Sequence, residues 1–125
     1  TLRQDIDTLR LNGFLRDRYL GLGVYISRPD GSTTYVSQNL CEMFGSTEEQ
    51  MLGFSWVTKV ENGMAMAAKW RMAAENGLPW DERYWIRHDG QLCEVTTQAF
   101  PMKNREGQVM SYVGMVRFTG AKKAL

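Results

Sequence analysis

The sequence predicts an α+β domain in which helices cover one face of an antiparallel sheet of five strands. Within residues 80–118, three runs rich in β-branched and aromatic residues are joined by sharp turns at 88–90 and 104–107. A shorter hairpin comes earlier, where residues 23–27 and 32–37 flank an Arg-Pro-Asp-Gly turn. Two hairpins cannot form an all-parallel sheet, and an antiparallel sheet of this kind buries one face against helices.

The segment between the hairpins has helical patterns. Residues 39–44 predict a short helix, and Ser46 with Glu49 fits a capping box at the start of a one-turn helix. The longest helix is predicted for residues 63–76, with Asn62 as its N-cap. Its apolar face is rich in alanine, so this helix can lie close to the sheet and cover it.

The two ends of the chain are predicted to extend beyond the sheet. Residues 1–22 have apolar side chains at helical spacing, which predicts an amphipathic helix that either pairs with a second copy of itself or packs on its own domain. Residues 23–119 form the globular domain, and residues 120–125 are predicted to begin a helix that links it to an output domain. Because the first residue is Thr1 rather than Met, we expect the chain to be a piece of a longer protein.

Composition restricts the classes of partner. The chain has 125 residues, with 15 Lys and Arg against 14 Asp and Glu, so it lacks the basic stripe that a nucleic-acid interface needs. No apolar run approaches the roughly 20 residues of a membrane span. The two cysteines, Cys41 and Cys93, lack the spacing of a metal site or a redox pair, which favours free thiols and a cytoplasmic location.

The sequence lacks the residue patterns that are typical of a catalytic site. His88 is the only histidine and lies in a predicted tight turn, where it is expected to be a solvated residue rather than a rigidly held base. The chain has no Gly-rich phosphate loop after a strand and no carboxylate pair on a covered face. We therefore expect a regulatory domain rather than an enzyme, with no metal site.

Several short motifs, taken in order, resemble the PAS sensor family. The stretch 45–53 resembles the family's Gly-x-Ser-x-Glu-Glu-Leu-Leu-Gly segment. The other matches are the tryptophans Trp56 and Trp70, then Glu82 with the turn at 87–90, and finally Pro101, Gly107 and residues 112–114. No single motif is specific, but their order and spacing together are. The match runs nearly unbroken from residue 23 to residue 118.

Two departures from the family pattern stand out. Where the family closes with Asp-Ile-Thr, this chain has Val-Arg-Phe-Thr at 116–119, which puts its coupling to a signalling helix in doubt. Where one PAS subgroup has Glu-Tyr-Arg, this chain has Glu82, Arg83 and Tyr84. The swap assigns Arg83 to a position where an inward apolar side chain is usual.

The resemblance implies a fold and a role. It implies strand order 2-1-5-4-3, with helices on one face of the sheet and an N-terminal flanking helix. It also implies a module of bacterial regulators, such as two-component systems, that senses a small molecule, a cofactor or a partner. The signal would pass to an attached kinase, cyclic-di-GMP enzyme, chemoreceptor or transcription factor. A homodimer is expected through residues 1–22 and the sheet.

The family pattern and strand alternation together predict a mostly apolar pocket between the sheet and the helices. The same side chains would also suit a well-packed core. The candidate lining residues are Met43, Trp56, Val60, Met66, Trp70, Arg83, Trp85, Val95, Thr97, Tyr112, Gly114 and Val116.

Arg83 is the candidate pocket residue whose direction decides which ligand the pocket could bind. An inward Arg83 would need a partner, either the carboxylate of a fatty or aromatic acid ligand or a protein carboxylate such as Glu82 or Glu94. The remaining alternative is a bulge that turns Arg83 to solvent.

The resemblance also bears on cofactors. Haem is disfavoured because residues 54–76 contain no histidine, which leaves only Cys41 or a methionine as a ligand. Flavin–cysteine photochemistry is disfavoured because residues 54–59 contain no cysteine. Non-covalent flavin stays open, since Trp56, Trp70 and Trp85 are compatible with it, although tryptophans that simply fill the core are favoured.

Two hypotheses follow from the sequence. In the first, the domain binds a small ligand and relays its occupancy to an output domain. In the second, the pocket is collapsed, and the domain acts as a dimerisation module through residues 1–22 and the outer face of the sheet.

Overall fold

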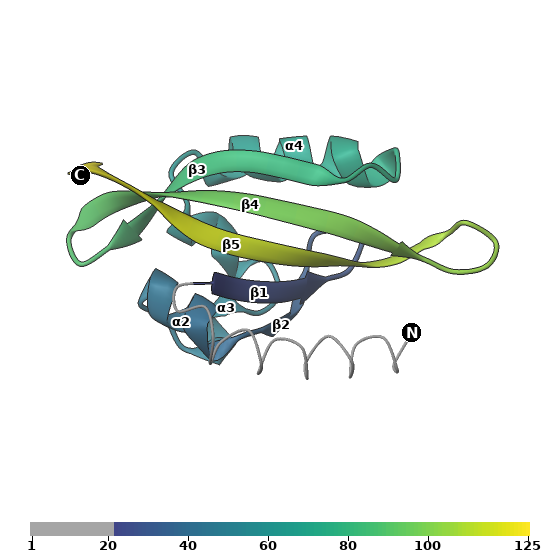
Figure 1. The fold of residues 1–125 in the computed structure, drawn as a ribbon, viewed down its shortest axis with the longest axis horizontal. Coiled ribbons are helices and arrows are strands. Elements are labelled where there is room, and N and C mark those ends of the chain that lie inside the picture. The colour runs from purple at the N-terminus through teal and green to yellow at the C-terminus, as the bar shows by residue number, and fades with distance from the viewer. Residues whose placement is uncertain (1–21) are drawn as a thin grey trace.

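The computed structural model describes residues 22–125, which form a sheet of five antiparallel strands in the order β2-β1-β5-β4-β3 (Figure 1). This arrangement confirms the predicted fold. The predicted helix in residues 1–22 lies outside the described residues, apart from Leu22. The strands are β1 (Leu22–Ser27), β2 (Thr33–Val36), β3 (Trp80–His88), β4 (Gln91–Lys103) and β5 (Val109–Ala124).

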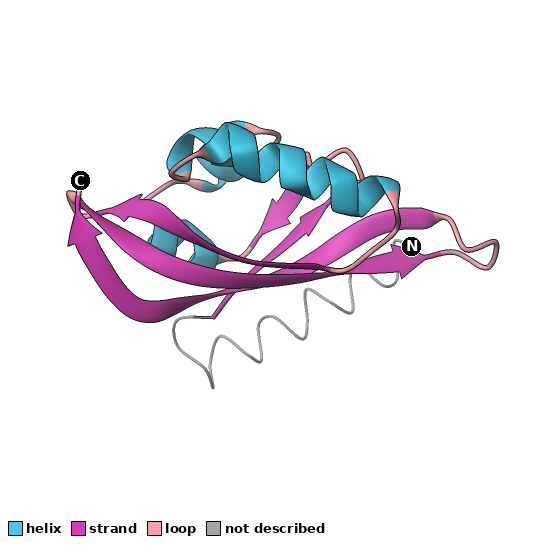
Figure 2. Ribbon diagram, turned by 90° about the horizontal axis from the view of Figure 1, so that it is seen from above, coloured by secondary structure: helices cyan, strands magenta, loops and turns pink. Residues whose placement is uncertain are grey.

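The helices lie on one face of the sheet, and α4 runs along it (Figure 2). The first of them follows β2, and the others follow it without an intervening strand. They are α2 (Gln38–Phe44), α3 (Glu48–Met51), the 3₁₀ helix η1 (Ser55–Lys59) and α4 (Gly63–Glu75). Within residues 22–125, no helix is long and apolar enough to cross a membrane.

The predicted capping box of α3 is wrong, and Asn62 is the N-cap residue of α4 as predicted but makes no side-chain hydrogen bond there. The capping box of α3 is formed by Thr47 and Gln50, one residue later than predicted, and Ser46 instead donates its hydroxyl to the carbonyl oxygen of Phe44 at 3.2 Å. Asn62 has left-handed backbone angles with φ of 57°, so its side chain does not cap α4. The shift at α3 reflects the ambiguity of adjacent Ser and Thr residues, because either can accept a hydrogen bond from a helix N-terminus.

The predicted helix at 120–125 is also wrong, because β5 continues as a strand to Ala124. Ala124 pairs with Gln91 and Lys123 with Leu92, past an irregularity in the ladder. Gly120 lies in this irregular segment with a φ of 97°, a value that glycine adopts without strain. The side of β4 that faces β5 offers these residues backbone hydrogen bonds that an isolated helical turn would lack.

The core lies between the sheet and the helices and has two parts. One is aliphatic and surrounds α2. The other is aromatic, where Trp70 of α4 packs edge-on against Trp80 and Tyr112 with ring centroids 5.5 and 4.8 Å apart. The hydroxyl of Tyr112 donates to the carbonyl oxygen of Leu78 at 2.9 Å. Burial of each large apolar side chain contributes about 1.5–3 kcal/mol, so this cluster fixes α4 on the sheet.

Candidate functional site

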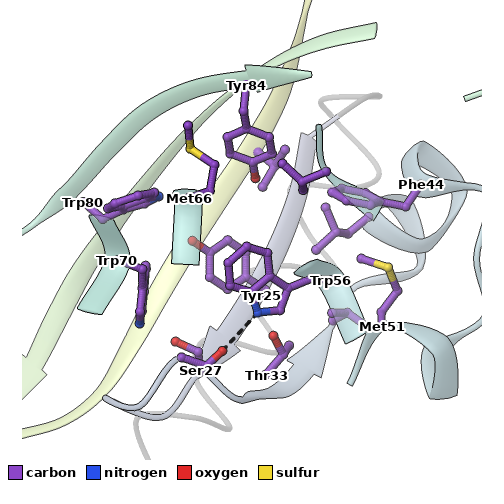
Figure 3. A pocket seen from close by; sticks show the side chains of 15 residues that line it. Tyr25, Ser27, Thr33, Phe44, Met51, Trp56, Met66, Trp70, Trp80 and Tyr84 are labelled. Atoms are coloured by element: carbon purple, nitrogen blue, oxygen red, sulfur yellow. Dashed lines mark hydrogen bonds between the residues drawn. The ribbon is translucent and has the colours of Figure 1, made fainter. Parts of the chain in front are cut away.

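A cavity of about 60 Å³ separates the sheet from the helices (Figure 3). Its walls come from β1, the β1–β2 turn, β2, β3, β5 and all four helices. The lining residues are Tyr25, Ser27, Gly31, Thr33, Val36, Leu40, Phe44, Met51, Trp56, Val60, Met66, Trp70, Trp80, Tyr84 and Val116.

Tyr25 and Ser27 bring β1 into the floor of the cavity. Alternate residues of a strand face the same side, so these two point toward the helices. The ring of Tyr25 lies over Gly114 of β5, in space that a side chain there would occupy. Its hydroxyl lies 3.4 Å from Thr97 Oγ1. The small residue on β5 therefore lets the large ring of Tyr25 lie flat in the floor.

Two indoles flank Gly31 in the β1–β2 turn. Trp56 of η1 donates its Nε1 hydrogen to the carbonyl oxygen of Gly31 at 3.2 Å. Trp70 approaches from α4, and a Cβ at position 31 would lie 3.0 Å from its Cδ1 and 3.1 Å from its Nε1. Gly31 has a φ of 93°, a conformation that favours glycine. This turn thus holds both tryptophans at one end of the cavity.

Two polar groups in the lining are buried without a hydrogen-bond partner. Within residues 22–125, neither Ser27 Oγ nor Trp70 Nε1 has one. Ser27 is 2% exposed and Trp70 is 6% exposed, so bulk water does not solvate these groups. An unsatisfied buried donor or acceptor costs about 1–3 kcal/mol. Both groups therefore lack a hydrogen-bond partner that a bound molecule could supply.

The cavity wall is electrically neutral. Among the described residues that line it, none is Asp, Glu, Lys, Arg or His. Burial raises the pKa of Tyr25 to about 12 and raises the pKa of Tyr84 further above its ordinary value. Both phenols therefore keep their protons at neutral pH. Glu82 faces the helices as well, but its carboxylate is 3.6 Å from the Lys69 ammonium of α4.

Five of the sequence-predicted pocket residues line the cavity: Trp56, Val60, Met66, Trp70 and Val116. Five others face the helices or lie in the core without reaching the cavity. Of these, Val95, Thr97 and Tyr112 are almost fully buried beneath other side chains, Met43 packs in the aliphatic core, and Gly114 is covered by Tyr25.

Arg83 and Trp85 were assigned to the wrong face of β3. Tyr84 lines the cavity, so its neighbours point to the opposite face, where Arg83 is exposed. Trp85 lies on that face with the Lys123 ammonium 4.4 Å from its ring centroid. The swapped Arg-Tyr order explains the error, because a shift of one residue moves every side chain of a strand to the other face. No bulge interrupts the pairing of β3 with β4 in the described chain.

Because Arg83 points outward, it cannot bind an acid in the cavity. An outward Arg83 reaches neither a ligand carboxylate in the cavity nor, within residues 22–125, a salt bridge to Glu82 or Glu94. Of the alternatives for Arg83, solvent exposure is the one observed. It results from the alternation of side chains along β3 and not from a bulge.

Sequence reasoning missed most of the cavity lining. The missed residues are Tyr25, Ser27, Gly31, Thr33, Val36, Leu40, Phe44, Met51, Trp80 and Tyr84. Alternation along β1 puts Tyr25 and Ser27 on the same face, so identifying either one would have identified the other. Gly31 carried a turn signal, but its position between two indoles depends on tertiary packing.

The potentially reactive side chains lie elsewhere. His88 was predicted to be a solvated turn residue, but it is the last residue of β3 and is half-buried, with its ring centroid 5.8 Å from that of Phe118. Burial and the nearby Glu48 raise the pKa of the Cys41 thiol, which disfavours the nucleophilic thiolate. Within residues 22–125, no cluster of His, Cys, Asp and Glu is suited to hold a metal ion.

Comparison with known families decides the classification. The family model described as the PAS fold matches residues 33–116, about two thirds of the chain. The chain belongs to the PAS family. No curated protein sequence matches it. The recognition drawn from its short motifs is therefore confirmed at the level of the family.

Solved structures share the PAS fold at low sequence identity. A light-oxygen-voltage domain studied with a flavin analogue has a TM-score of 0.69 and 20% identity, with 89% of this chain and 85% of that chain covered. The N-terminal domain of a diguanylate cyclase with a PAS/PAC sensor from Marinobacter aquaeolei has a TM-score of 0.69 and 13% identity, with 78% and 94% covered.

A third similar structure comes from a putative light and redox sensing histidine kinase of Haloarcula marismortui. Its domain has a TM-score of 0.68 and 10% identity, with 86% of this chain and 97% of that chain covered. At these identities the similarity establishes the fold, and PAS domains are sensory modules of larger proteins. The molecule or partner that a PAS domain senses depends on the residues of its own site.

Proposed function

We propose that this PAS domain binds a small molecule in the cavity and relays its occupancy to an attached effector domain. The observation that carries the proposal is the pair of buried, unpartnered polar groups, Ser27 Oγ and Trp70 Nε1, in a mostly apolar lining. A collapsed core would normally satisfy or omit such groups. A cavity with a few polar groups in an apolar wall is the usual form of a ligand site.

The relay would run from the cavity to the end of β5. Val60 lines the cavity and pairs with Ile86, and the backbone of the next residue, Glu61, donates to the carbonyl oxygen of Trp85 at 2.8 Å. The carboxylate of Glu61 is 3.2 Å from the ammonium of Lys123 near the end of β5. A ligand that moves η1 and Val60 would change these contacts, which lie beyond the Val-Arg-Phe-Thr sequence at 116–119.

An effector of the kinase or cyclic-di-GMP class, attached in the same polypeptide, is consistent with the diguanylate cyclase and histidine kinase neighbours. A cytoplasmic location is consistent with the free thiols of Cys41 and Cys93.

The proposal does not include a flavin or a haem. Pockets for drug-sized ligands measure roughly 300–1,000 Å³, several times the volume of this cavity. Residues 54–59 also contain no cysteine for a flavin adduct, and residues 54–76 contain no histidine for haem iron. The similarity to light-oxygen-voltage domains therefore does not bring flavin into the proposal.

A second candidate function is dimerisation through the outer face of the sheet. Phe100 of β4 is 48% exposed on that face and pairs with Val113 of β5. Exposed apolar side chains on a sheet face are typical of protein contacts. The two functions are compatible, since the cavity lies on the opposite face of the sheet.

The proposal is tested by mass spectrometry of the protein purified from its host without added ligand. Native spectra are expected to show a bound mass that disappears under denaturing conditions, and a W70A variant is expected to lose it. A visible absorption band would instead indicate a large chromophore and contradict the size argument. A bound mass retained by W70A would place the ligand outside the cavity.

A further inference from the structure

Building on the proposed function, we propose that the ligand is a small uncharged molecule, of no more than about six non-hydrogen atoms, that carries a hydrogen-bond acceptor and contacts Ser27 and Trp70. Small amides and ketones have this chemistry. Three independent features of the cavity carry the proposal: its volume, the neutrality of its wall, and the place of its unpartnered polar groups.

Volume limits the part of a ligand that the cavity can enclose. One water needs roughly 10–15 Å³ of such space, and an apolar cavity of about 150 Å³ admits benzene. The cavity here, at about 60 Å³, lies between these limits. It therefore has room for a few non-hydrogen atoms, or for a small group of waters, and not for an aromatic ring system.

Neutrality of the wall excludes a charged ligand. A carboxylate or an ammonium group inside the cavity would lose its hydration without gaining an ionic partner from the described residues. Arg83 would add a positive charge only if it pointed inward, and it is exposed on the other face of β3. The hydroxyls of Tyr25 and Tyr84 stay protonated, so they provide dipoles rather than charge.

The polar groups define one end of the cavity. Trp70 Nε1 lies beside Gly31, and Ser27 ends β1 just before the same turn. Figure 3 shows the side chains of Trp70 and Ser27 among the lining residues. An indole N–H can only donate a hydrogen bond, so the ligand must supply an acceptor. The Ser27 hydroxyl can donate to an acceptor or accept from an amide N–H. Trp56 does not compete, because its N–H is already bonded to Gly31.

The experiment is an NMR titration of the ¹⁵N-labelled chain with acetamide and, separately, with acetate. These probes have nearly the same shape and differ in charge. The four tryptophans give four indole N–H signals, assigned from single Trp→Phe variants. We expect acetamide to shift the Trp70 signal saturably and to leave Trp85 on the outer face unchanged, whereas acetate at pH 7 shifts neither. For so small a probe the dissociation constant will be on the order of 0.1 mM or weaker.

Two serine variants test the contact itself. Ser27→Ala is expected to weaken acetamide binding by about two- to tenfold, the effect of one neutral hydrogen bond. Ser111→Ala is the matched control, because Ser111 precedes the inward-facing Tyr112 on β5 and so faces the opposite side. Equal losses in the two variants would overturn the assignment of Ser27.

The outcomes separate this inference from the function on which it rests. Acetate that binds as well as acetamide overturns the neutral ligand class. If acetamide leaves Trp70 unchanged while flavin mononucleotide or a fatty acid shifts it, the ligand class is wrong and the proposed sensing function survives. If no probe shifts Trp70, so that waters alone occupy the cavity, both proposals fail.

Discussion

The phenol ring of Tyr25 lies against the Cα atom of Gly114 on the adjacent strand, where any side chain at position 114 would overlap it. This contact sets the depth of the cavity, because the ring of Tyr25 forms its floor. It also explains why Gly114, on the cavity side of β5, does not itself line the cavity.

We expect Gly114→Ala to lower the free energy of unfolding by about 1–3 kcal/mol, since the added methyl group forces the Tyr25 ring out of place. Urea unfolding of the wild type, both single variants and the double variant would measure this. In a Tyr25→Ala background the same substitution should cost much less, because the overlap is gone. Additive losses in the double variant would contradict the contact.

Ser27→Ala is expected to leave the ligand-free protein as stable as the wild type or up to about 1 kcal/mol more stable, since it removes an unsatisfied buried hydroxyl. Ser37→Ala is the matched control. Ser37 is equally buried, but its Oγ accepts hydrogen bonds from the backbone of Val24 at 3.0 Å and Leu40 at 3.1 Å. Loss of that helix cap should cost about 1–2 kcal/mol. Comparable destabilisation by both substitutions would show that Ser27 has a structural partner.

Gly31→Ala tests the packing of the β1–β2 turn against Trp70. The substitution places a methyl group about 3 Å from the indole and strains a backbone with positive φ. Gly107→Ala is the control, because Gly107 has a φ of 81° but nothing within 4 Å of its added Cβ. Both should destabilise the fold, whereas only Gly31→Ala should shift the Trp70 indole signal. A shift from Gly107→Ala, or none from Gly31→Ala, would contradict the described turn.

The buried phenol of Tyr25 predicts a loss of stability in alkali. Its pKa is raised from 10.0 to about 12 in the folded state, so the unfolded chain releases this proton first as the pH rises. The stabilisation is complete below pH 10 and falls by roughly 2–3 kcal/mol between pH 10 and 12. Tyr25→Phe should show a shallower decline over that range in urea unfolding at several pH values. Identical declines would mean that Tyr25 titrates as an exposed phenol.

Lys123 anchors the end of β5 through Glu61 and the ring of Trp85. Because these contacts are partly exposed, Lys123→Gln should lower the free energy of unfolding by only about 0.5–1 kcal/mol, and less at high salt. Lys122→Gln, at the neighbouring exposed position, is the control. Equal effects of the two substitutions in low salt would show that the anchor contributes nothing.

The fold was predictable because its signals are local. The Asp-Gly turn between β3 and β4 and the alternation in the long strands specify hairpins by themselves. Gly45, with a φ of 60°, ends α2 as its residue type predicts. The end of β5 was not predictable in this way, because residues 120–124 form a strand only through pairing with β4.

The site was less predictable because it depends on which residues of each strand face the helices and on tertiary packing. A single residue of misalignment placed Arg83 inward in place of Tyr84 and suggested an acid-binding site. Tyr25 became part of the floor through the absence of a side chain at Gly114, a relationship that spans two strands far apart in the sequence. Trp70 was found because helical spacing and a family motif both indicated it, whereas Trp56 was found through the family motif alone.

The most direct test of the whole account is one acetamide titration followed by NMR at two places, the Trp70 indole and the backbone amides of residues 122–124. If a small neutral ligand in the cavity is sensed and relayed, both sets of signals will shift with the same saturation curve, and Lys123→Gln will reduce only the second. Shifts at Trp70 without any at the end of β5 would contradict the relay. The absence of a shift at Trp70 with acetamide or any larger probe would contradict ligand binding in the cavity.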